Sequence, residues 1–170
     1  QRIKKYFKNF KNQIKLNNTQ VDLDYNKDKF KLSLKSGYVI DKINQNVFLN
    51  ISKNNKNYFF TVDLGLSSSE VEIKELDYLK KVNVNANLII DGVYRQNKEI
   101  FFKKINYLEG NEKILIENIE LGKNDKIKNL DFFQIDIESS SGIRNQLEFK
   151  KINDNYYLTG TQFDGAENIK

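Results

Sequence analysis

Residues 82–108, VNVNANLIIDGVYRQNKEIFFKKINYL, decide the fold class. From position 82 to position 90 every second residue is apolar, and asparagines stand between the first of them. A strand with one dry face requires this period of two, whereas a helix would not keep the asparagines on one side. Asp91 and Gly92 then supply turn chemistry, and a second apolar run follows at residues 99–108. The stretch therefore predicts a strand, a bend and another strand.

The same alternation recurs along most of the chain. It predicts roughly ten to twelve strands at the spacing expected of an all-β protein. A short helical turn is expected at residues 76–80. The further predicted strands lie at residues 21–25, 30–35, 38–43, 47–51, 58–64, 71–74, 114–121, 130–138, 143–150 and 156–163.

Successive hairpins indicate an all-β fold, a long twisted antiparallel meander that curls into an open groove. The chain holds 12 phenylalanines and 9 tyrosines but no tryptophan. In the alternative fold, a compact β-sandwich, these rings would face each other and fill a core. In a sheet that curls without closing, the same rings would line a trough suited to acyl chains. The sequence leaves both arrangements open.

The two ends differ from the middle. Residues 1–13 carry apolar side chains at helical spacing among lysines, which predicts a short amphipathic helix or end cap. Residues 14–165 form the predicted antiparallel sheet, and residues 166–170 begin a truncated helix or a loop. The chain has no methionine, even at position 1, so we expect a segment of a larger protein whose anchor lies outside residues 1–170.

Composition removes most familiar catalytic sites. The chain has no cysteine and no histidine, hence no thiolate ligand and no imidazole base. Asp22 with Asp24, and Asp136 with Glu138, place two carboxylates on one side of a strand, as an acid/base pair or a metal site requires. These carboxylates alternate with apolar residues, which favours a solvated face instead. We therefore expect no enzyme activity, no cofactor and no metal.

The net charge of +5 and the pI of about 9.1 permit an anionic partner. Arginine supplies only three of the positive charges, although the guanidinium group is preferred for phosphate and base recognition. Residues 101–104 combine two phenylalanines with two lysines, but they stand alone. Nucleic acid is therefore not an expected partner.

The C-terminal stretch 154–165, DNYYLTGTQFDG, resembles a phrase that recurs in AsmA-like bacterial envelope proteins of the YhdP and TamB type. Residues 143–149, IRNQLEF, resemble the strand that leads up to that phrase. The strand-after-strand style of residues 21–137 is similar to the family in pattern only. Turns rich in lysine and asparagine depart from the family, which often has Gly, Pro and Ala there.

The resemblance implies a bridge-like lipid transport protein that is anchored at the inner membrane, extends through the periplasm and moves phospholipid toward the outer membrane. Its partners would be phospholipid acyl chains and neighbouring segments of the same chain, with no catalytic residue and no cofactor. The rival reading is a β-sandwich interaction module of adhesin-like type. The residues expected to line the lipid groove are Phe60, Val62, Leu88, Ile90, Phe133, Ile135, Ile137, Leu147 and Phe149.

Overall fold

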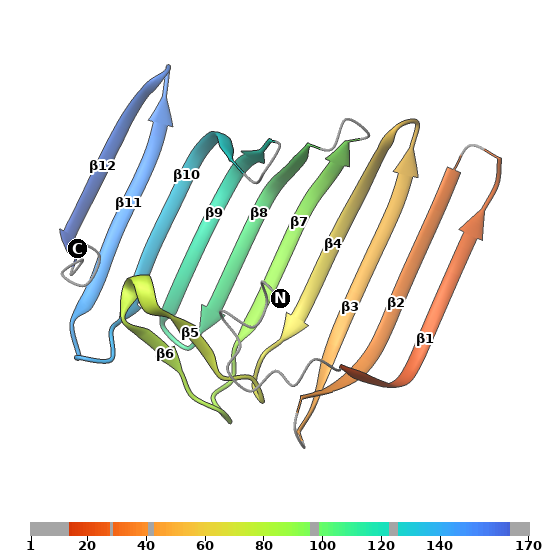
Figure 1. The fold of residues 1–170 in the computed structure, drawn as a ribbon, viewed down its shortest axis with the longest axis horizontal. Helices are drawn as coiled ribbons and strands as arrows, with labels where there is room; N and C mark the ends of the chain where they lie inside the picture. The colour runs from red at the N-terminus through yellow and green to blue at the C-terminus, as the bar shows by residue number, and fades with distance from the viewer. Residues whose placement is uncertain (1–13, 28, 41–42, 96–98, 123–125, 164–170) are drawn as a thin grey trace.

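The structure, a computed structural model, describes residues 14–27, 29–40, 43–95, 99–122 and 126–163. Ten of the strands form one antiparallel sheet in which each strand pairs with its neighbours along the chain (Figure 1). These strands are β1 (Lys15–Tyr25), β2 (Lys29–Ile40), β3 (Ile43–Asn54), β4 (Asn57–Gly65), β7 (Asn87–Arg95), β8 (Ile100–Glu109), β9 (Glu112–Leu121), β10 (Ile127–Glu138), β11 (Arg144–Ile152) and β12 (Asn155–Gln162).

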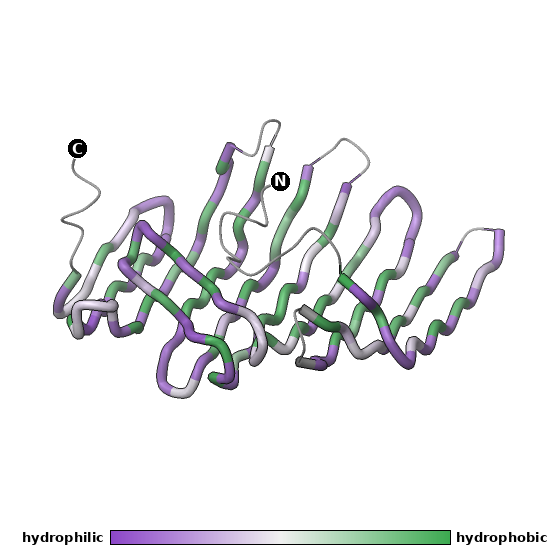
Figure 2. The backbone as a smooth tube through the Cα atoms, turned by 60° about the horizontal axis from the view of Figure 1, so that its bottom comes forward, coloured by the Kyte–Doolittle hydropathy of each residue, from purple (hydrophilic) through white to green (hydrophobic). Residues whose placement is uncertain are grey.

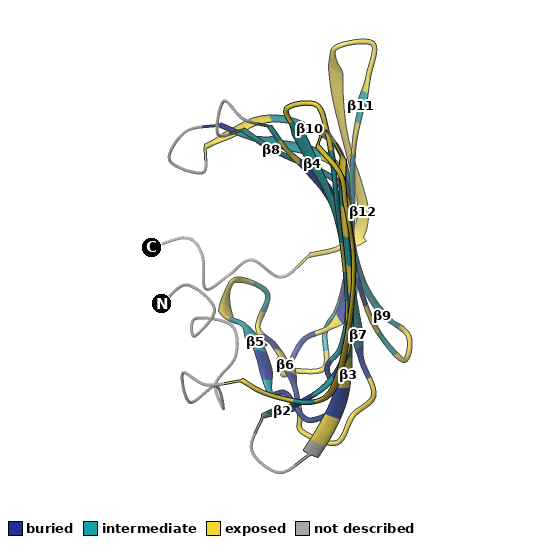
Figure 3. Cartoon of the chain, turned by 90° about the vertical axis from the view of Figure 1, so that its right-hand side faces the viewer, coloured by how far each residue is buried: buried dark blue, intermediate teal, exposed yellow. Residues whose placement is uncertain are grey.

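One hairpin interrupts the meander. Between β4 and β7 the chain forms β5 (Val71–Ile73) and β6 (Tyr78–Lys80), which pair only with each other. The large sheet is bent, and this hairpin lies on its hollow side, called the concave face below (Figure 3). The opposite side of the sheet is called the outer face.

The predicted fold class is confirmed, since the described residues form an open antiparallel meander with β1 at one edge and β12 at the other. No second large sheet faces it within the described ranges, so the sandwich alternative is not the architecture observed. The helix predicted for residues 1–13 and the start of a helix or loop predicted for residues 166–170 lie outside the described residues.

The core forms where the hairpin meets the concave face. Leu66, Val71, Tyr78 and Ala86, from the hairpin and the segments that flank it, pack against side chains of β8 and β10. The sheet side of this cluster comprises Tyr107, Ile135 and Ile137. The apolar surface of the sheet is therefore covered at one end of the strands, by only two short strands.

The predicted turn at Asp91 and Gly92 is wrong, because β7 continues through both residues to Arg95. A Cβ on Gly92 would lie 2.5 Å from the ring carbon Cζ of Phe60 and 2.8 Å from the carbonyl oxygen of Phe101. Gly92 is therefore needed because a ring and a neighbouring strand approach its backbone closely. Glycine within a strand can mark such a close approach as well as a bend.

The predicted start of that strand is also wrong. Residues 82–86 form a turn and an extended connection from β6 to β7, in which Asn83 adopts a left-handed conformation with φ 67°. Its backbone N–H donates to the carbonyl of Ser67 at 2.8 Å. Asparagine tolerates this conformation better than other non-glycine residues, so the alternating asparagines support a turn as well as a strand.

The helical turn predicted at residues 76–80 is displaced toward the N-terminus. A 3₁₀ turn occupies Lys74–Leu76 and ends at Asp77, whose φ is 46°. Residues 78–80 instead form β6, in which buried Tyr78 and Lys80 flank exposed Leu79. This period of two belongs to a strand.

Replacing Gly92 by alanine is expected to lower the free energy of unfolding by about 1–3 kcal/mol, since the added methyl group overlaps the backbone of β8. Gly65→Ala is the matched control, because a Cβ there meets its nearest atom at 3.5 Å. Urea denaturation of both variants measures the difference. Equal stability of the two variants would contradict the close approach at Gly92.

Candidate functional site

The concave face carries an apolar row that crosses all ten strands of the sheet. Each member is paired by register with the next, and every strand contributes one residue. We call this the central row. It consists of Val21, Leu34, Leu49, Val62, Ile90, Ile105, Ile116, Phe133, Phe149 and Leu158.

Two further rows flank the central row on the same face. The hairpin row, on the side of β5 and β6, consists of Ser36, Val47, Leu64, Leu88, Tyr107, Ile114, Ile135, Leu147 and Gly160. The far row consists of Leu23, Leu32, Ile51, Phe60, Gly92, Phe102, Ile119 and Leu130. None of the three rows contains a charged residue.

Bulges keep these rows on one face. The pairing of β7 with β8 shifts beside Gly92, so that Phe102 stays level with Phe60 across the glycine. The two rings meet edge to face with their centroids 6.0 Å apart. Without the shift, Phe102 would point to the outer face, and each residue of β8 that precedes it would also change face. Figure 2 shows the resulting alternation of apolar and hydrophilic segments along the strands.

The three rows together are called the trough below, and the hairpin β5–β6 covers only part of it. The hairpin packs on the hairpin row and on part of the central row, as far as Phe133. The rest of the central row and the far row have no covering element among the described strands. Nine steps between neighbouring strands of about 4.8 Å give the trough a length of roughly 43 Å.

All nine residues predicted to line a groove lie on the concave face. Phe60, Val62, Ile90 and Phe149 are half-buried and belong to the far and central rows. Ile135 and Ile137 are only 3% and 0% exposed, since they lie beneath the hairpin. Leu88, Leu147 and Phe133 are half-buried and pack against the same cluster.

Sequence reasoning missed several members of the open trough. The alternation of apolar and polar residues was visible in each strand. The register between strands and the bulges decide which residues stand side by side, and neither can be read from a single strand. The missed residues of the central and far rows are Val21, Leu23, Leu32, Leu34, Leu49, Ile51, Phe102, Ile105, Ile116, Ile119, Leu130 and Leu158.

A buried polar cluster ties the hairpin to the sheet. The hydroxyls of Tyr78 and Tyr107 lie 2.7 Å apart, and both donate to the carboxylate of Glu109, Tyr107 at 2.8 Å. The two rings meet edge to face at 6.0 Å. Burial, together with the nearby carboxylate of Glu109, raises the pKa of both phenols well above the ordinary value. These hydroxyls therefore stay protonated and keep donating.

Lys80 is fully buried, yet its ammonium group is well satisfied. It donates to the backbone carbonyls of Ser67, Ser69 and Lys81 at 3.2, 2.8 and 2.9 Å. Burial lowers the pKa of Lys80. Because these carbonyls belong to the loop before β5 and to the residue that follows β6, the lysine holds the hairpin in shape.

The outer face is solvated, and cationic side chains cover its aromatic rings. Lys35, Lys103 and Lys150 lie over Phe48, Phe59 and Phe132, with each ammonium nitrogen 5.5 to 5.7 Å from the ring centroid. Apolar stems of lysine cover rings while the charge stays in water. The concave rows lack charged residues to do the same.

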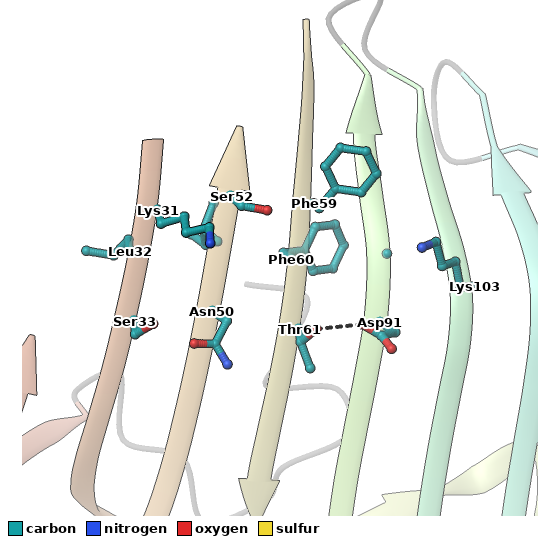
Figure 4. A pocket seen from close by; sticks show the side chains of 12 residues that line it. Lys31, Leu32, Ser33, Asn50, Ser52, Phe59, Phe60, Thr61, Asp91 and Lys103 are labelled. Atoms are coloured by element: carbon teal, nitrogen blue, oxygen red, sulfur yellow. Dashed lines mark hydrogen bonds between the residues drawn. The ribbon is translucent and has the colours of Figure 1, made fainter. Parts of the chain in front are cut away.

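A shallow hollow on the outer face arises where small side chains stand side by side (Figure 4). Asn50 and Thr61 lie near its middle, and the Thr61 hydroxyl donates to Asp91 at 2.6 Å. Lys31 and Lys103 lie at its sides. Its polar groups are open to solvent and carry no acid/base pair.

One member of each predicted acidic pair has a polar partner, and Asp22 accepts from the Gln20 amide at 3.3 Å. Asp136 accepts from the guanidinium of Arg144 at 2.6 Å, and the same guanidinium binds Glu112 at 2.6 Å. Within the residues that the structure describes, no group of three His, Cys, Asp or Glu side chains is placed to hold a metal ion. The described part of the chain also contains no helix with the length and apolar character needed to span a membrane.

Fold and site define a class: an open antiparallel β-meander whose concave face carries a continuous apolar row across all ten strands. Comparison of the sequence with models of known protein families finds no match. Searches among characterised proteins and solved structures find none either.

Truncation of a covered residue should cost more than truncation in the open trough. Ile137→Ala leaves a cavity beneath the hairpin and is expected to lower the free energy of unfolding by about 2–5 kcal/mol. Ile90→Ala removes side-chain atoms that are half-exposed and should cost no more than about 1–2 kcal/mol. Urea denaturation measures both, and an equal cost would mean that the trough is packed shut at Ile90.

The buried phenols predict a loss of stability in alkali. Burial raises the pKa of Tyr38 to about 12, and the pKa values of Tyr78 and Tyr107 are raised further. Unfolded tyrosines ionise near about 10, so above this pH the unfolded state releases protons first and the free energy of unfolding falls. Urea denaturation between pH 8 and 11, chosen around that value of about 10, measures the fall.

The double variant Tyr78→Phe, Tyr107→Phe serves as the control for this titration. It should lose part of the alkaline slope, while the opposite contribution of Lys80 is common to both proteins and cancels. An identical slope in the variant and the unchanged protein would show that the two phenols ionise equally in both states.

Proposed function

We propose that this chain binds the acyl chains of phospholipid along its concave face and acts as a segment of a lipid-conducting groove. The observation that carries the proposal is the central row, in which ten neighbouring strands each present one apolar side chain and no charged residue intervenes.

The energetics of such a surface favour a lipid. An apolar band roughly 43 Å long, built from nine strand steps and only partly covered by the hairpin, is the kind of contiguous apolar surface that marks an interaction site. Each methylene group that leaves water contributes about 0.8 kcal/mol, and a contact of this kind does not require a fixed position along the row. A long acyl chain can therefore bind tightly at many equivalent places, as transport along a groove requires.

The proposed setting is the one that the resemblance to AsmA-like envelope proteins implies. The segment would lie in the periplasm within a larger chain anchored at the inner membrane, and phospholipid would pass along it toward the outer membrane. The open, bent sheet and the apolar concave face are consistent with that setting. In this proposal the segment is not an enzyme, and its work is the binding and release of acyl chains.

The observed architecture does not favour a sandwich-type interaction module. That function requires a core enclosed between two sheets, with binding on the loops. In the described residues the ten-stranded sheet faces only the hairpin β5–β6.

Two carboxylates on the concave face should abolish lipid binding. In the test variant Leu49→Asp, Phe133→Asp, both charges lie in the central row. The matched control is Phe48→Asp, Phe132→Asp. Each of these residues directly precedes a test residue in the sequence and lies on the outer face, beneath Lys35 or Lys150. Both variants gain the same charge, so only the face differs.

The readout is photocrosslinking of the purified protein to a phospholipid with a diazirine in its acyl chain. We expect labelling of the unchanged protein and of the control, and a loss of more than about tenfold in the test variant, because a buried carboxylate without a partner is strongly disfavoured. Circular dichroism and cooperative unfolding verify the fold. Undiminished labelling of a folded test variant would falsify the proposal, as would failure of the unchanged protein to label.

A further inference from the structure

The edge strand β12 lacks the devices that normally prevent strand addition. Its eight residues, NYYLTGTQ, include no charged residue and no proline, and all of them are exposed. Leu158 is 66% exposed and Tyr156 is 63% exposed. Among the described strands only β11 pairs with it. An uncharged edge of this length is a template for another strand.

The other edge is better protected. β1 carries Asp22 and Asp24 on the outer face, and its pairing with β2 shifts between Asn17 and Gln20, beside Asn18 with φ 50°. Charges and bulges are two of the devices by which natural sheets avoid edge-to-edge association. The two edges of this sheet are therefore not equivalent.

We infer that β12 is an assembly edge at which two copies of this chain pair antiparallel about a two-fold axis, joining their sheets into one. The inference does not depend on lipid binding. A two-fold axis perpendicular to the sheet brings β12 of one copy antiparallel to β12 of the other and keeps both concave faces on the same side.

Symmetry, overlap and continuity of the central row together select the register. Residues of the concave face must stand opposite residues of the concave face, so a residue of even number on β12 faces another of even number. Two such registers share the longest overlap, one centred on Leu158 (155–161) and one centred on Thr159 (156–162). Only the first places Leu158 opposite Leu158 of the second copy. The central row of one copy then continues into that of the other.

The side chains are self-complementary in this register. On the concave face Tyr156 of each copy stands opposite Gly160 of the other, so a ring faces a residue without a side chain. Phe60 and Gly92 of β4 and β7 show that this fold already uses such a pair. On the outer face Tyr157 stands opposite Thr159. No charge is buried anywhere along the pair.

Disulfide trapping tests the register directly, because the chain has no cysteine of its own. Directly opposed residues of antiparallel strands have Cα atoms about 4.5 or 5.5 Å apart, a separation that a disulfide spans. Leu158→Cys should therefore form a covalent dimer on mild oxidation. Val21→Cys is the matched control, since it lies in the same row on the other edge strand and is 53% exposed; it should stay monomeric.

Sedimentation equilibrium tests the association without a crosslink. The unchanged protein should show a concentration-dependent dimer between micromolar and millimolar concentration, as small interfaces do. Leu158→Lys places two ammonium groups opposite each other and should abolish the dimer, whereas Val21→Lys should leave it intact. Circular dichroism verifies that both variants are folded.

Three results would overturn the inference. They are a monomer at every concentration, equal crosslinking of the two cysteine variants, and preferential crosslinking of Leu158→Cys to Val21→Cys in a mixture. The last result would show head-to-tail pairing of β12 with β1. None of them bears on photocrosslinking to phospholipid, so the two proposals fail separately.

Discussion

The structure depends on the register of one long hydrogen-bonded ladder. A strand presents alternate residues to opposite faces, so a slip of one residue anywhere would move an apolar set to the outer face. The pairing of β4 with β7 shows what register achieves, since Leu64, Val62 and Phe60 stand level with Leu88, Ile90 and Gly92. Ten strands in such register turn a local alternation into an apolar surface that no single strand contains.

Apolar side chains on the two faces of the sheet are shielded from water in different ways. On the outer face, lysine stems cover rings such as Phe48 and Phe132, so the sheet remains compatible with water there. On the concave face, the hairpin β5–β6 covers Ile135 and Ile137 and is held by Tyr78, Tyr107 and Glu109. The central row beyond the hairpin has neither kind of cover, and this difference is the reason for proposing it as the lipid-binding surface.

Sequence alternation was sufficient to predict most of the strands, their antiparallel succession and the face to which all nine groove candidates belong, but it left the choice between an open meander and a sandwich undecided. It was insufficient where one residue type serves two purposes. Asn83 suits a left-handed turn as well as a wet strand face, and Gly92 suits a close approach as well as a bend. The burial of Ile137 depends on a hairpin distant in sequence, and no pattern within β10 could reveal it.

The concave face and the β12 edge are exposed for the same physical reason. A single-layer sheet cannot enclose its own apolar residues, so it must leave a face or an edge for another molecule. The central row lacks charge across ten strands, which suits a fluid ligand that needs no directional bond. The β12 edge offers backbone donors and acceptors beside Leu158, which suit another strand. The two surfaces are chemically distinct, and they meet where the central row reaches β12.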